Sequence, residues 1–107
     1  MTISGPQDGE KIAIRIDPDL ADLIPGYLEN RRKDVQSMRA ALERGDFESI
    51  RILGHSMKGS GGGYGFAAVT EIGRALEGAA RQGNAADIRR QVEELSSYLE
   101  RIEIVYG

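Results

Sequence analysis

The chain has 107 residues, which is enough for one domain with a single hydrophobic core. It contains no cysteine and one histidine, so disulfide bonds, thiolate metal sites and imidazole clusters for zinc or copper are excluded, and we expect no metal site. The formal net charge of −3 argues against non-specific nucleic-acid binding, which depends on an excess of Lys and Arg.

The N-terminal segment predicts no secretory signal and no membrane anchor. It lacks a basic region followed by an apolar run, and nowhere does the chain approach the roughly 18 apolar residues of a membrane span. We therefore expect a cytoplasmic protein without membrane contact.

Residues 1–10 are rich in Gly, Pro, Ser and Asp and predict a flexible tail. Residues 11–16 alternate apolar and polar side chains, which indicates an extended segment, so we assign 1–16 to a tail and extended segment and 17–107 to a helical domain.

A second β-prone stretch, IEIVY, occupies residues 102–106. The ends of an up-down four-helix bundle lie at the same end of the molecule, so this stretch and residues 11–16 are candidates for pairing. The alternative is that the last helix continues through residues 102–105. Periodicity leaves both interpretations open.

Apolar residues at helical spacing predict four helices. An Asp-Pro pair at residues 17–18 favours a first helical turn, and a bend at a Pro-Gly pair precedes a long helix over residues 25–44. Further helices are expected after Asp46, from Phe66 to the glycine at 83, and from Asn84 onward. Short turns between helices require neighbours to be antiparallel. The predicted fold class is all-α, an antiparallel up-down four-helix bundle with a short N-terminal extended segment.

The second predicted helix carries the only histidine, in the stretch GHSMKGSGGGYGF at residues 54–66. With about 100° per residue, His55 points roughly 135° away from the apolar stripe, on a face that also holds Glu48, Ile52, Gly59 and Gly62. A histidine at this position is exposed to solvent. Glycine in a helix costs roughly 0.5–1 kcal/mol relative to alanine. The glycines therefore indicate a special role, such as the close approach of a partner's backbone.

The residues on this face are able to accept a phosphoryl group. A neutral imidazole is a nucleophile, and Lys58 lies one helical turn further on the same side, where it places positive charge near a phosphate on His55. Lys58 precedes the glycines, so the segment is not an ATP-binding Walker loop. The residue after His55 is Ser56, where histidine kinases carry an acid, so we interpret His55 as a passive acceptor and donor.

The run from His55 to Ser60, followed by Gly65-Phe66, resembles the phosphorylation motif of histidine-containing phosphotransfer (HPt) domains. In that motif a His is followed by Lys at +3, Gly at +4, a small residue at +5 and Gly at +10. The resemblance extends over residues 18–106, including a Gly-Asp turn at 45–46 and a Leu-Glu pair at 76–77. It implies a phosphorelay intermediate that accepts a phosphoryl group on His55 Nε2 from a receiver-domain aspartyl phosphate and passes it to another receiver aspartate.

The resemblance also implies the partners, which are response-regulator receiver domains and a hybrid histidine kinase. We expect a monomer that is not itself an enzyme, has no cofactor and no autokinase activity, and relies on Mg²⁺ supplied by the receiver. Lys58 neutralises the phosphate charge. The expected docking face lies around His55, where Ile52 is an apolar side chain in polar surroundings. Its residues are Glu48, Arg51, Ile52, Gly59 and Gly62.

Two departures from the HPt pattern concern the histidine helix. Gly54 stands where Ala is usual, and Gly61 to Gly63 form a denser glycine run, so we expect the helix to end between residues 59 and 63. One alternative function is a non-phosphorylated helical adaptor that binds a signalling partner. Another is an acceptor domain of a larger histidine kinase, although Met1 followed by a tail favours a free-standing protein.

Overall fold

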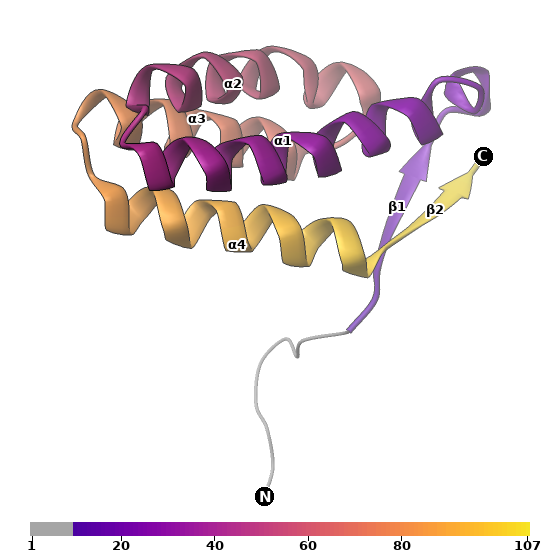
Figure 1. Cartoon of the computed structure of the whole chain (residues 1–107). Helices are drawn as coiled ribbons and strands as arrows, with labels where there is room; N and C mark the ends of the chain where they lie inside the picture. Colours follow the sequence, from indigo (N-terminus) through magenta and orange to yellow (C-terminus); the bar gives the residue numbers. More distant parts are fainter. Residues whose placement is uncertain (1–9) are drawn as a thin grey trace, which may run out of the picture.

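The computed structural model describes residues 10–107. Except for Glu10, the segment expected to form a flexible tail lies outside the described residues. The described part is mostly helical and contains four α-helices, as the all-α prediction requires (Figure 1). The helices are α1 (Ile24–Arg44), α2 (Phe47–Ser60), α3 (Ala67–Arg81) and α4 (Ala85–Arg101), accompanied by short 3-10 helices η1 (Pro18–Leu20) and η2 (Gly62–Tyr64) and strands β1 (Ile12–Ile16) and β2 (Ile102–Tyr106).

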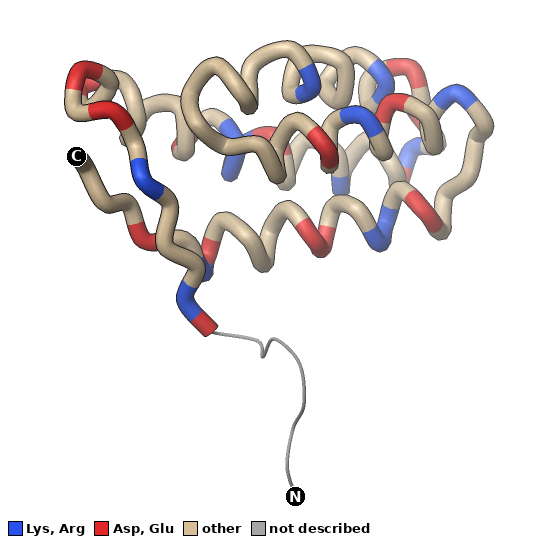
Figure 2. The backbone as a smooth tube through the Cα atoms, turned by 180° about the vertical axis from the view of Figure 1, so that it is seen from behind, with Lys and Arg blue, Asp and Glu red and all other residues tan. Residues whose placement is uncertain are grey.

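The helices lie side by side, and each turns back on the preceding one (Figure 1). Local signals set the turns. Gly45 has φ 70°, a left-handed conformation that closes α1, and the Asp46 side chain caps α2 by accepting the Ser49 amide at 3.1 Å. Asn84 caps α4 in the same way. Basic and acidic residues are interspersed along the backbone of the bundle (Figure 2).

The core is built from the inward faces of all four helices. Met38 of α1, Ile50 of α2, Leu76 of α3 and Leu95 of α4 are completely buried. Their burial removes apolar surface from water and provides the main stabilisation of the bundle. Within residues 10–107, every helix is too short or too polar to cross a membrane.

Glycines bring α2 and α3 into backbone contact. A Cβ added to Gly73 would lie 2.5 Å from the amide nitrogen of Lys58 and 2.7 Å from the carbonyl oxygen of Gly54. A Cβ added to Gly54 would lie 2.8 Å from the amide nitrogen of Glu77. Gly54 is therefore required by this packing, which accounts for the absence of the alanine that is usual at this position.

The two ends of the described chain pair as parallel strands. The register runs from Ile12 opposite Ile102 to Ile16 opposite Tyr106. The inward isoleucines of both strands pack against the helical core. Because α4 ends at Arg101 and β2 begins at the next residue, the alternative of a helix continuing through residues 102–105 is wrong.

Two boundaries depend on the loop between α2 and α3. The second helix ends at Ser60, inside the interval expected for its break, and the third begins at Ala67 after Phe66. Gly61 is buried, and a Cβ there would lie 2.6 Å from the amide nitrogen of Thr70. Packing of the loop against α3 therefore explains part of the glycine run.

Candidate functional site

His55 lies on the outward face of α2, and its side chain is 66% exposed. This is the orientation expected from its phase in the helix. The preceding residue, Gly54, touches α3, so the histidine stands at the edge of the closest helix contact in the bundle. Its ring can therefore reach α3 and solvent at once.

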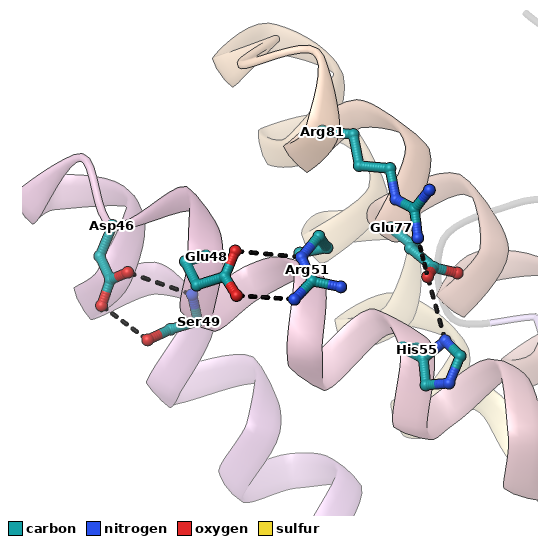
Figure 3. A network of polar contacts seen from close by, with 7 residues as sticks. All are labelled: Asp46, Glu48, Ser49, Arg51, His55, Glu77 and Arg81. Atoms are coloured by element: carbon teal, nitrogen blue, oxygen red, sulfur yellow. Dashed lines mark hydrogen bonds and ion pairs between the residues drawn. The ribbon is translucent and has the colours of Figure 1, made fainter.

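Glu77 of α3 is the buried partner of the histidine. Only 5% of this residue is exposed. Its Oε2 atom lies 3.0 Å from His55 Nδ1 and 3.0 Å from Arg81 Nη2 (Figure 3). Its Oε1 atom lies 2.8 Å from Lys58 Nζ. One carboxylate thus joins the histidine to two permanent cations.

The Glu77 carboxylate is ionised at neutral pH. The hydrogen bond from Lys58, helped by the one from His55, holds the pKa of Glu77 at about 2, although burial acts in the opposite direction. An ionised carboxylate only accepts hydrogen bonds, so the proton of the His55–Glu77 hydrogen bond belongs to Nδ1. In the neutral ring Nε2 then carries the free lone pair. The contact therefore selects the nucleophilic atom.

Lys58 is positioned by this same carboxylate. Its side chain is 35% exposed, and its ammonium lies on the Glu77 oxygen that does not bind His55. Two cations surround one anion here, which leaves one excess positive charge beside the histidine. Such a surplus of positive charge favours an anion beside the imidazole ring.

The residues expected to form the docking face are brought to the same side of α2, with one exception. Arg51 and Glu48 form a two-bond ion pair at 3.0 and 2.6 Å (Figure 3). Ile52 is 53% exposed. Gly59 is exposed with open space around its backbone. Gly62 belongs instead to η2, where its amide donates to Thr70 Oγ1 at 2.8 Å.

Sequence reasoning did not assign a role to Glu77, which appeared only in the Leu-Glu pair of the family resemblance. The available signal was an acidic residue one helical turn after Gly73, on a side of the third helix that is otherwise apolar. Within residues 10–107, no three His, Cys, Asp or Glu side chains gather into a metal-binding group.

The site thus combines an exposed imidazole nucleophile with a neighbouring ammonium, groups that can accept and stabilise a phosphoryl group. Residues 22–104 match the family described as Hpt domain, and the chain belongs to this family. Hpt domains are phosphotransfer modules of two-component phosphorelays; they interact with receiver domains and kinases and have no autokinase activity. No curated protein and no solved structure matched the chain.

Proposed function

We propose that residues 17–107 form an antiparallel up-down four-helix bundle that acts as a monomeric phosphorelay intermediate. His55 Nε2 accepts a phosphoryl group from a receiver-domain aspartyl phosphate and passes it to another receiver aspartate. A hybrid histidine kinase is the proposed source of the first receiver. The observation that carries this proposal is the 3.0 Å contact between Glu77 and Nδ1 of an exposed histidine, because it leaves Nε2 as the nucleophile.

Transfer at this site requires no proton movement on the histidine. The Nε2 lone pair attacks phosphorus, and the bond between phosphorus and the aspartyl oxygen breaks with its electrons returning to the receiver carboxylate. Nδ1 keeps its proton throughout, so the phosphorylated ring carries a positive charge next to Glu77, which stabilises it. The reverse attack by a second aspartate releases the same neutral ring, so the geometry serves both directions.

Lys58 is the proposed phosphate-neutralising residue. It lies one helical turn from His55, and its contact with Glu77 keeps the ammonium at the site before phosphate arrives. Three donors already occupy the Glu77 oxygens. We therefore propose that Mg²⁺ and the remaining catalytic groups come from the receiver, and that this chain has no cofactor of its own.

The proposed receiver-docking face surrounds His55 on α2 and continues into η2. Its support is an exposed apolar side chain, Ile52, beside the charged Glu48–Arg51 pair and the open backbone of Gly59. A small apolar centre with a charged rim fits a transient protein contact. Gly62 of η2 is the proposed extension of this face beyond the end of α2.

The direct test is phosphotransfer from a receiver domain loaded with acetyl phosphate and Mg²⁺. We expect acid-labile, base-stable label on the wild-type protein, none on His55→Gln, and normal label on the control Ser56→Ala, which changes the adjacent exposed residue. Labelling of the His55→Gln variant would refute the assignment. A non-phosphorylated adaptor would bind the receiver in every variant and carry no label in any of them.

A second variant tests the role of the carboxylate. Glu77→Gln keeps an oxygen that accepts the Nδ1 proton but removes the negative charge, so we expect transfer about tenfold slower, because charge-assisted hydrogen bonds are roughly twice as strong as neutral ones. Glu77→Ala should be slower still. Equal rates in Glu77→Gln and wild type would show that the charge has no part in the reaction.

A further inference from the structure

Gly78 is a glycine that the packing of the chain does not require. It lies in the interior of α3 and is exposed, and no atom of residues 10–107 lies within 4 Å of a Cβ added to it. Glycine destabilises a helix relative to alanine. Gly73 of the same helix is different, because its missing Cβ admits the backbone of α2. The absence of a side chain at Gly78 therefore points to a partner outside this chain.

Gly78 lies on the same side of the molecule as His55. It follows Glu77, whose carboxylate lies 3.0 Å from the imidazole ring. With about 100° per residue, Gly78 is turned roughly 100° from Glu77, which faces α2. His55 is turned by the same angle from Gly54, which faces α3. Because α3 runs back along α2 (Figure 1), the two rotations carry Gly78 and His55 to one outer surface.

A receiver that reacts at His55 covers this part of α3. A protein interface of standard size buries about 800 Å² on each partner, which corresponds to a disc of about 16 Å radius. Gly78 adjoins the residue that touches the ring, and neighbouring Cα atoms are about 3.8 Å apart, so an interface centred on His55 includes it. Gly59 is also exposed with open space around it, one helical turn from His55 on α2. Backbone is therefore bare on both helices beside the ring.

Two arginines flank Gly78 on the exposed surface of α3. Arg74 lies one turn before it and Arg81 one turn after it, and both side chains are 62% exposed. The acidic residues of α3 are Glu77, which is buried, and Glu71, which faces Arg74 at 3.7 Å as an exposed pair. The exposed surface of this helix therefore carries a net positive charge.

The adjoining face of α2 does not reverse this charge. Glu48 and Arg51 form an ion pair without net charge, and Lys58 adds a cation beside His55. A receiver carries its phosphoryl group on a carboxylate and is anionic at this point, so the two surfaces are complementary. A second copy of this chain would present the same positive charge and is disfavoured as the occupant.

We propose that the receiver docks on α3 as well as on α2, with its backbone passing over Gly78 between Arg74 and Arg81. This inference rests on the proposed phosphotransfer function and extends the receiver-docking face beyond α2 and η2. Gly78 then determines which receivers reach His55, because a side chain there would hold a receiver away without touching the imidazole ring. Arg74 and Arg81 attract the anionic partner.

The test measures phosphotransfer from the acetyl-phosphate-loaded receiver at increasing receiver concentration. We expect Gly78→Leu to raise the half-saturating concentration about tenfold and to leave the maximal rate unchanged, because only binding is weakened. Gly78→Ala should show a smaller change of the same kind and a higher Tm than wild type. Ala40→Leu is the matched control, because it adds a leucine at an exposed position of α1, roughly 160° from the buried Met38, and it should react like wild type.

The flanking charge and the contact itself are measured separately. Arg74→Glu should raise the half-saturating concentration, and added salt should reduce its difference from wild type. Arg89→Glu reverses an exposed arginine of α4 and should react like wild type. Unphosphorylated receiver added to the full ¹⁵N-labelled chain should shift the amide signals of Gly78 and Arg74 but not that of Ala40.

The outcomes separate docking on α3 from the phosphotransfer function. If wild type is labelled on His55 and Gly78→Leu reacts at the wild-type half-saturating concentration, docking on α3 is overturned and the phosphotransfer function stands. Unshifted amide signals of Gly78 and Arg74 at saturating receiver lead to the same conclusion. If wild type carries no label, the phosphotransfer function and docking on α3 are both overturned.

Discussion

Replacing Gly73 by alanine is expected to separate α2 from α3. The new Cβ would lie 2.5 Å from the Lys58 amide nitrogen, whereas ordinary contacts begin at 3.4 Å. Both helices present backbone atoms here, and backbone cannot rotate away as a side chain can. The helices therefore have to move apart by about 0.9 Å, the difference between those two distances.

This displacement has a cost in stability. Overpacking a core costs about 1–3 kcal/mol, and a clash with backbone belongs at the upper end of that range. The better helix propensity of alanine offsets roughly 1 kcal/mol, so we expect a net loss of about 2 kcal/mol. In a domain of this size such a loss lowers Tm by roughly 8–16 °C.

The same displacement affects the functional site. The distance from His55 Nδ1 to Glu77 Oε2 is 3.0 Å, and a further 0.9 Å takes it beyond hydrogen-bond range. The proton on Nδ1 then loses its acceptor, so the two neutral tautomers of His55 become mixed and phosphotransfer slows. Nitrogen NMR of the imidazole ring measures the tautomer ratio, and circular dichroism during heating measures Tm.

Gly78→Ala is the matched control, because Gly78 is exposed on the same helix and no atom lies within 4 Å of its added Cβ. It should gain about 0.5–1 kcal/mol and keep the wild-type tautomer ratio. If Gly73→Ala were as stable as wild type while Gly78→Ala showed its gain, the backbone contact between α2 and α3 would be refuted.

Three further outcomes are expected. The Glu77 carboxyl should titrate with a pKa of about 2 when followed by ¹³C NMR. The stability that its contacts contribute is therefore fully present above pH 4.5, the ordinary pKa of a Glu side chain, and is lost as pH falls through 2. A pKa of 4.5 would contradict the contacts of Glu77 with His55, Lys58 and Arg81. Lys58→Ala should keep the fold but slow phosphotransfer about tenfold, with partial recovery in Lys58→Arg, and an unchanged rate would remove Lys58 from the site. Asn84→Ala should lose about 1 kcal/mol in urea unfolding through loss of the α4 cap, while Asn84→Asp should not; equal stability of both variants would argue against the cap.

Local signals were sufficient for the helices and for the exposure of the histidine. The turn at Gly45, the cap at Asn84 and the apolar stripes each depend on residues a few positions apart, so they can be predicted from the sequence. His55 also lies on the side of its helix opposite to the apolar residues, which predicts correctly that its ring faces solvent.

The role of the glycines near His55 could be predicted from the sequence only in part. Their abundance near His55 indicates room for a partner, which fits the open backbone of Gly59. Gly54 and Gly61 instead accommodate α3, because their missing Cβ atoms would collide with its backbone. A sequence reports that a side chain is absent, but not which neighbour occupies the space.

By itself, the sequence determined four helices, their boundaries to within a few residues, and a solvent-facing histidine with a lysine one turn away. Only the tertiary structure decided that Glu77 of a different helix holds that histidine by Nδ1, and that the two ends of the described chain meet as β1 and β2. The physical reason is range: caps and helical phase act within a few residues, whereas the Glu77 contact joins residues 22 positions apart, and it exists only because Gly54 and Gly73 let the two helix backbones touch.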